Sequence, residues 1–123
     1  MKKLVAEIIK AAGCSPIDEL AVGKQIEVSQ DGFMDLTIEK VGHDRVSVAH
    51  YYTQRGDLMS DPEIVFQIED DGTWLPIRYT QQPNIHDFDP DGIAHTQPFI
   101  DQWSSNLRAQ GFIEAAKHAD LSG

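Results

Sequence analysis

Hydrophobic residues near the start of the chain recur at the spacing of an amphipathic helix. Apolar side chains lie three and four residues apart, with charged residues between them, at Leu4, Val5, Ile8, Ile9 and Ala12. Gly13 is a natural stop for this helix, which we expect over residues 4–12. Ser15 and Pro16 then supply an N-cap and a first-turn proline. They predict a second short helix that Gly23 ends.

From Gln25 onward the period changes to two, which is typical of strands with one buried and one wet face. Tight turns are predicted at Asp31-Gly32, at 42–44 and at 70–72, where glycine and aspartate cluster. Pro76 cannot donate a ladder hydrogen bond, so the last strand is expected at an edge of the sheet. The predicted strands are 25–29, 34–39, 46–52, 64–69 and 75–79.

Helical spacing returns near the C-terminus. Thr96 is a plausible N-cap, and Gly111 is a suitable C-terminal stop. Residues 112–119 are expected to add one or two helical turns, and 80–95 is the longest irregular segment. The helical stripe comprises Phe99, Ile100, Trp103 and Leu107. The pattern predicts a single α+β domain over residues 1–123: an antiparallel β-meander of about five strands with N- and C-terminal helices packed on one face.

The charge balance narrows the choice of partner. Twenty acidic residues against ten basic ones give a formal net charge of -10 and a sequence pI near 4.7. Such a field repels phosphate backbones, so we expect no direct contact with nucleic acid. A basic protein partner is compatible with this charge, and so is the simpler reading that the charge keeps the protein soluble.

The chain has one cysteine, Cys14, so it forms no intramolecular disulfide, which fits a reducing compartment. We interpret Cys14 as a helix-boundary residue, because no catalytic triad can be assembled around it. Glu7 and Lys10 interrupt the apolar run that a signal peptide needs. No stretch reaches the length of a membrane span, so we expect a cytoplasmic protein without a membrane partner.

Several strings in the second half of the chain are familiar in combination. Val48-Ala49-His50-Tyr51-Tyr52 leads into Gly56-Asp57-Leu58-Met59-Ser60-Asp61-Pro62-Glu63, and Phe99-Ile100-Asp101-Gln102-Trp103 is followed by Asn106-Leu107-Arg108-Ala109-Gln110-Gly111-Phe112. In this order and spacing, residues 45–112 resemble the DUF6908-like family of small uncharacterised bacterial, phage and mobile-element proteins. The resemblance implies a mobile-element or host-defence context. It brings no catalytic residues, because none are defined for the family.

One loop matches the first half of a calcium-binding loop. Asp87, Asp89 and Asp91 occupy its first, third and fifth positions, and Gly92 its sixth. The twelfth position should carry a bidentate glutamate, but here it is Pro98. A turn-rich loop is the alternative reading. A divalent metal ion is the one cofactor that the sequence suggests.

Histidines near this loop extend the metal hypothesis. His86 and His95 flank the carboxylates, so His86, Asp89 and His95 are a candidate transition-metal set, although their separation matches no recognised zinc spacing. His50 continues an apolar strand face, and we interpret it as a partly buried histidine with its hydrogen bonds satisfied.

A second acidic group, Asp57, Asp61 and Glu63, falls between the third and fourth predicted strands. Metal-dependent nucleases place paired carboxylates before a strand, but the lysine that usually follows is absent. The structural alternative is a loop in which Asp61-Pro62 opens a turn and Asp57 caps its own loop. The structural reading is the working assumption, and a binding role for the group, together with Tyr51 and Tyr52, is kept beside it.

The leading functional hypothesis is a non-enzymatic protein-binding module, with no catalytic residues, that presents an acidic face to a basic host protein. Trp74, Arg78 and Tyr79 suggest an additional aromatic patch, because aromatic residues and arginine are favoured interface anchors. An exposed edge strand also makes a homodimer reasonable. The alternative hypothesis is a metal-binding module or a metal-dependent hydrolase that uses the loop from Asp87 to His95.

Overall fold

The computed structural model describes residues 1–122. Its helices are α1 (Lys2–Ala11), α2 (Gln97–Ala109) and α3 (Phe112–Ala115), with short 3-10 turns at Ile17–Glu19, Ala94–Thr96 and Ala116–His118. Its strands are β1 (Gln25–Val28), β2 (Leu36–Gly42), β3 (Arg45–Gln54), β4 (Asp57–Ile68), β5 (Trp74–Gln81), β6 (Ile85–Phe88) and β7 (Asp120–Ser122).

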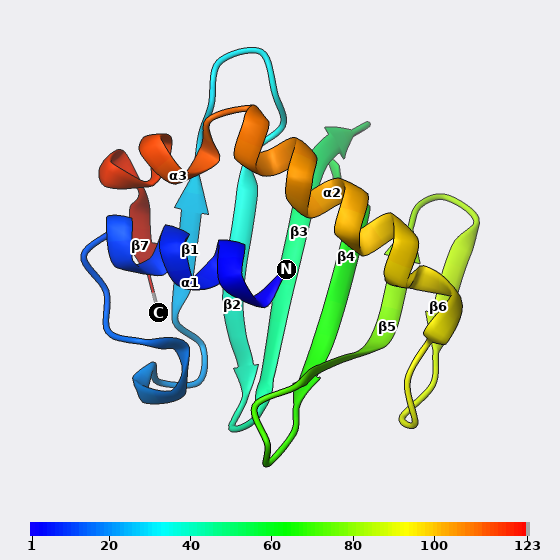
Figure 1. Cartoon of the computed structure of the whole chain (residues 1–123). Coiled ribbons are helices and arrows are strands. Elements are labelled where there is room, and N and C mark those ends of the chain that lie inside the picture. Colours follow the sequence, from blue (N-terminus) through cyan, green and yellow to red (C-terminus); the bar gives the residue numbers. More distant parts are fainter. Residues whose placement is uncertain (123) are drawn as a thin grey trace.

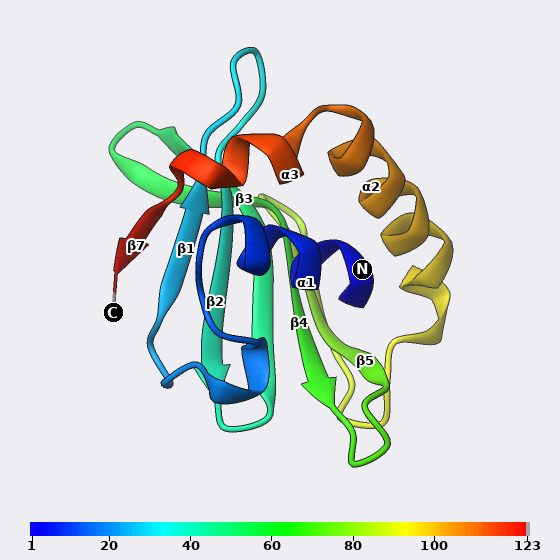
Figure 2. The same ribbon diagram turned by 60° about the vertical axis from the view of Figure 1, so that its left-hand side comes forward.

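The strands form one antiparallel sheet, and the helices lie on one of its faces (Figures 1 and 2). The order is β6-β5-β4-β3-β2-β1-β7, so β1 to β6 form a meander and β7 returns to lie beside β1. The α+β class and the antiparallel sheet are therefore confirmed. No helix within residues 1–122 is long and apolar enough to cross a lipid bilayer.

The hydrophobic core fills the space between the helices and the sheet. Both long helices bury one stripe, as their periodicity predicts, and the sheet contributes every second residue of β1 to β4. Phe99 is the exception in the α2 stripe, since it is partly exposed and stacks on Trp103. Fully buried members include Ile8, Leu36, Val48, Phe66 and Leu107.

The prediction of about five strands is wrong in number, because the sheet has seven. The two missed strands, β6 and β7, are short, and every one of their residues is exposed. A strand without a buried face carries no alternating apolar signal. Residues 80–95 are therefore not a purely irregular segment, since β6 lies within them.

β5 is not the edge strand that Pro76 led us to expect, because β6 pairs with its residues 78–81. Pro76 itself lies outside this pairing. The register between β4 and β5 shifts at this point: Val65 pairs with Arg78, whereas Phe66 pairs with Pro76, which leaves Ile77 as an extra residue. Pro76 is tolerated because β6 does not pair along this part of β5, so no ladder partner on the outer side requires a backbone N–H there. The Pro76 carbonyl accepts a hydrogen bond from the Ile93 backbone N–H at 2.7 Å.

Residues 57–63 are strand and not loop, which corrects the expected Asp61-Pro62 turn. The turn lies earlier, at Arg55 and Gly56, whose φ values of 54° and 85° are typical of a two-residue hairpin turn. The β3–β4 pairing consequently continues out to Gln54 and Asp57.

Two local expectations near the N-terminus also need correction. The predicted second helix is only the single turn Ile17–Glu19, and Pro16, in place of the predicted Ser15, occupies its N-cap position. The strand expected from Met34 begins at Leu36 instead, so Asp31-Gly32 lies in a longer loop than a two-residue hairpin. Met34 is consequently partly exposed and does not join the core face.

Candidate functional site

The face of the sheet opposite the helices is built from two rows of side chains that cross all seven strands. Alternate strand residues point to opposite faces, and the neighbours of these residues in β1 to β4 belong to the core on the helix side. The first row is Asp120, Glu27, Thr37, Ala49, Glu63, Thr80 and His86. The second row is Ser122, Gln25, Glu39, Ser47, Val65, Arg78 and Phe88.

Four carboxylates lie in these rows without an ion-pair partner: Glu27, Glu39, Glu63 and Asp120. The two ion pairs within residues 1–122 join Glu7 to Arg108 and Asp87 to His95, away from these four groups. No cationic side chain of residues 1–122 therefore lies within 4.0 Å of these four carboxylates. We call these two rows the helix-free face.

Hydrogen bonds hold the centre of the helix-free face in place. Glu63 accepts at Oε2 from the Ser47 hydroxyl at 2.9 Å and from the Tyr51 hydroxyl at 3.0 Å. Burial, reinforced by the negative charge of Glu63, raises the pKa of Tyr51 far above its ordinary value, so the phenol stays protonated and donates. Gln25 Nε2 likewise donates to Glu39 Oε1 at 3.0 Å. These carboxylates are consequently fixed acceptors.

Positive and apolar side chains occupy the other end of the helix-free face. The Arg78 guanidinium lies 5.8 Å from the ring centroid of Phe88, which is 58% exposed. Arg45 Nε donates to Gln67 Oε1 at 2.9 Å. A hollow of about 220 Å³ between Arg45, Arg78 and Ile77 marks this end. The face is therefore acidic over β7, β1 and β2 and mixed over β4 to β6.

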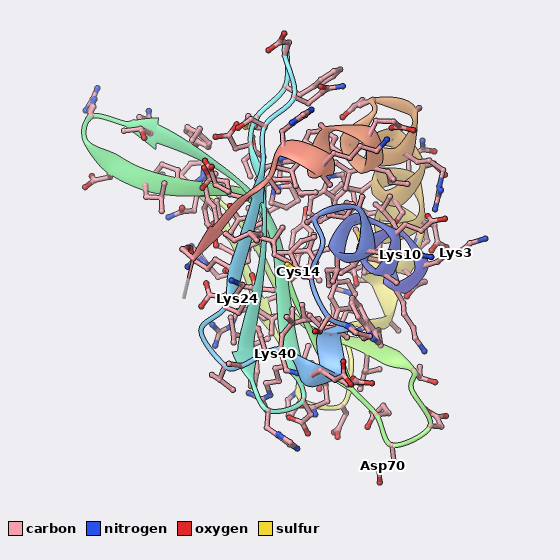
Figure 3. The ribbon with its side chains drawn as sticks, turned by 90° about the vertical axis from the view of Figure 1, so that its left-hand side faces the viewer. Lys3, Lys10, Cys14, Lys24, Lys40 and Asp70 are labelled. Carbon is pink, nitrogen blue, oxygen red and sulfur yellow. The ribbon has the colours of Figure 1, made fainter. Side chains whose placement is uncertain are left out.

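The β3–β4 hairpin projects past the rest of the sheet and forms an arm, residues 51–60. Strand β2 pairs with β3 only as far as His50, and β5 pairs with β4 only from Glu63. In Figure 3 the arm bends away from the helices, to the side of the helix-free face. Near its tip Leu58 is 67% exposed. Backbone edges and an apolar tip of this kind are suited to contact another chain.

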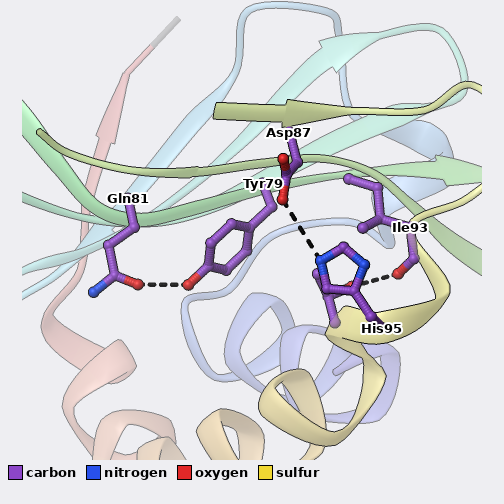
Figure 4. Close-up of polar contacts among 6 residues, drawn as sticks. Tyr79, Gln81, Asp87, Ile93 and His95 are labelled. Atoms are coloured by element: carbon purple, nitrogen blue, oxygen red, sulfur yellow. Dashed lines mark hydrogen bonds and ion pairs between the residues drawn. The ribbon is translucent and has the colours of Figure 1, made fainter. Parts of the chain in front are cut away.

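The predicted binding residues do not gather into one acidic cluster. Asp57 lies near the tip of the arm, and Glu63 belongs to the helix-free face. Asp61 accepts from Gln81 Nε2 at 3.0 Å, and Gln81 in turn accepts from the Tyr79 hydroxyl (Figure 4). This network lies on the helix side, because the Tyr79 ring packs against Phe99 of α2.

The two predicted aromatic residues of the binding group separate in the same way. Tyr51 bonds to Glu63 on the helix-free face, and Tyr52 pairs with Met59 within the arm. The extra aromatic patch does not form as one surface either, because Arg78 belongs to the helix-free face whereas Tyr79 packs on α2. Trp74 instead packs against Phe66 of the core.

The predicted metal loop brings only two of its candidate ligands together. His95 Nε2 lies 3.5 Å from Asp87 Oδ2, and both side chains are exposed (Figure 4). Asp89 Oδ1 instead accepts the Asp91 backbone N–H at 2.9 Å, as in a turn. His86 lies beside Arg78 and Thr80 on the helix-free face. In the described part of the chain no three His, Cys, Asp or Glu side chains converge as a metal site.

His50 is buried at 7% exposure, more deeply than the partly buried histidine that the sequence predicts. Its ring lies 5.5 Å from Trp103 and 5.8 Å from Phe112, and Nδ1 is 3.0 Å from the Asp35 carbonyl oxygen. Burial lowers the pKa of His50 below its ordinary value, although the Asp35 carbonyl and the charge of Asp61 oppose that shift. The folded protein therefore favours the neutral imidazole.

This lowered pKa predicts a pH-dependent stability. Below about pH 6.5 the unfolded chain takes up a proton at His50 that the folded chain resists, so the free energy of unfolding should fall as the pH drops. The slope from one such proton is at most about 1.4 kcal/mol per pH unit. Urea unfolding at pH 7.5 and 5.5 should show a smaller difference for His50→Gln than for the wild type. His43→Gln, at an exposed turn, should leave the difference unchanged. Equal differences for wild type and His50→Gln would contradict the assignment.

Comparison with known proteins gives a match to one family model. Neither a curated protein nor a solved structure matches the chain. The model of the family described as "Domain of unknown function (DUF6908)" matches residues 3–113, which include α1, the meander, α2 and the helix-free face up to β6. The match confirms the resemblance seen in residues 45–112 and extends it to the N-terminal helix. The chain belongs to the DUF6908 family.

Proposed function

We propose that this protein is a non-enzymatic protein-binding module whose helix-free face contacts a basic segment of its partner. The observation that carries the proposal is the group of four carboxylates on that face, none of them in an ion pair. Negative charge without an ion-pair partner, on the sheet face that no helix covers, gives electrostatic complementarity to a cationic surface. The net charge of -10 adds long-range steering in the same direction.

The arm supplies the apolar part of the same contact. It bends to the side of the helix-free face, so one partner can touch both surfaces. Leu58 offers the exposed apolar surface that an interface centre needs, near the charged Asp57.

The chemistry of this surface indicates the class of partner. A nucleic-acid-acting protein carries the positive surface that phosphate recognition requires, and an acidic module can occupy that surface. We therefore propose inhibition of such a host protein as the biological form of the contact. The phage or mobile-element context implied by the family resemblance supports this reading.

A charge-neutralised variant tests which surface binds. We expect the triple variant Glu27→Gln, Glu39→Gln, Asp120→Asn to bind a short lysine- and arginine-rich peptide roughly tenfold more weakly than the wild type, because three charge attractions are lost. Fluorescence anisotropy at low and physiological salt measures this loss. Glu63 is left intact, because it anchors Ser47 and Tyr51.

A matched control variant distinguishes the effect of charges on the helix-free face from the effect of the net charge of the protein. The variant Glu19→Gln, Glu69→Gln, Asp70→Asn removes the same charge from exposed positions outside the two rows. We expect its affinity for the peptide to change less than threefold, within the range of exposed charge effects. Equal losses in the two triple variants would show that net charge alone attracts the peptide, and would overturn the assignment of the face.

A further inference from the structure

A cleft with apolar walls opens on the helix side of the sheet, away from the helix-free face. Its volume is about 320 Å³, at the lower end of the range for small-molecule sites. Ala6 and Ile9 of α1 form one wall, Ile17 of the 3-10 turn forms the second, and Ile68 and Trp74 form the floor. Ile17, Ile68 and Trp74 remain only partly buried because the cleft lies between them.

The rim of the cleft is polar and mainly positive. Lys2 and Lys10 of α1 border the cleft, together with Asp18 of the turn. The Lys2 ammonium donates to the Gly72 carbonyl at 2.7 Å, which holds it at the mouth with donor capacity to spare. Lys10 is exposed and is absent from the ion pairs of residues 1–122. The rim therefore carries two cations against one carboxylate in a chain whose net charge is -10.

We propose that this cleft binds a small anionic amphiphile: an apolar tail between α1, Ile17 and Trp74, and a carboxylate or similar anion at Lys2 and Lys10. Apolar walls with a few placed polar groups are the usual composition of a ligand site. The cations favour a negative head over a neutral or positive one. The site is independent of the helix-free face, so the two assignments are tested separately.

Decanoate is the probe, and the chain contains its own reporter. Cys14 lines the cleft and is the single thiol in the sequence, so its alkylation by iodoacetamide reports on occupancy. We expect saturating decanoate to slow this alkylation at least fivefold and to change the emission of Trp74. Octanoate, which is shorter by two methylenes, should bind about fifteenfold more weakly if the tail is buried.

Substitutions in the walls and the rim of the cleft test whether decanoate binds there. Ala6→Phe places a ring in the cleft and should abolish the protection of Cys14 by decanoate. Lys10→Gln should weaken decanoate about two- to fivefold, as for an exposed ion pair. Lys3→Gln is the matched control, because Lys3 extends from the solvent side of α1 and does not line the cleft (Figure 3). Its affinity for decanoate should stay within the error of the measurement.

Three results would overturn the proposal. Decanoate that neither protects Cys14 nor changes the fluorescence does not occupy the cleft. Decanoate that binds Ala6→Phe as it binds the wild type occupies another surface. Decanol with the affinity of decanoate would show that the lysines select no anion, and would refute the ligand class. Circular dichroism of each variant confirms that the fold is retained before these results are interpreted.

Discussion

Phe112→Ala is expected to lower the free energy of unfolding by about 3–5 kcal/mol, the usual cost of removing a large buried ring. Phe112 is fully buried, and its ring centroid lies 5.8 Å from that of His50 and 6.2 Å from that of Phe33. It begins α3, which packs beside α1, so its loss opens the junction between two helices and the sheet. Urea unfolding at neutral pH measures the effect.

The control for this substitution is Phe88→Ala. Phe88 is exposed on the helix-free face, so its replacement should change the free energy of unfolding by only about 0.5 kcal/mol. A loss of stability as large for Phe88→Ala as for Phe112→Ala would mean that the core does not lie on the helix side alone. A stable Phe112→Ala protein would contradict the packing described for α3.

Phe112→Ala should also change the pKa of His50. Removing the ring of Phe112 admits water beside the imidazole, so the pKa of His50 should rise toward its ordinary value. Titration by NMR follows that change independently of the stability measurement. Agreement between the two measurements would connect the core packing to the pH dependence.

The predictable parts of the fold are the helices and strands that bury one face, because burial leaves a periodic pattern of apolar residues in the sequence. Helix α1 and strands β1 to β4 each bury one face, and their apolar periodicity follows from that. The residues of β6 and β7 are all exposed, so these strands have no apolar periodicity that could predict them. Pro76 misled the placement of β5, because β6 pairs only with residues 78–81 and leaves the outer side of β5 at the proline without a ladder partner.

The acidic surface could be predicted in charge but not in position. The sequence pointed to Asp57, Asp61 and Glu63 because they are near one another in the chain, yet they lie on different sides of the sheet. Glu27 and Asp120 become neighbours only because β7 pairs with β1, which no local pattern indicates. The arm had a local signal, since Arg55-Gly56 separates two β-rich segments by a two-residue turn.

Lys40→Ala is the second substitution from which we expect a large effect, a loss of about 2–4 kcal/mol in the free energy of unfolding. Lys40 is 2% exposed on the helix side of β2, and its ammonium donates to the Ile17 carbonyl at 2.7 Å. Alanine removes the packed stem and leaves that carbonyl without its donor. Lys3→Ala, on the exposed side of α1, should be close to neutral.

Lys40→Met distinguishes the contribution of the packed aliphatic stem of Lys40 from that of its ammonium group. Methionine keeps most of the stem and removes a buried ammonium that has no carboxylate partner, so its loss should be at most about 1 kcal/mol. Both substitutions free the Ile17 turn, which is a wall of the cleft, so Cys14 should react faster with iodoacetamide in each. Unchanged Cys14 reactivity in both variants would show that the hydrogen bond does not hold this wall. A Lys40→Ala protein with wild-type stability would show in addition that Lys40 anchors nothing.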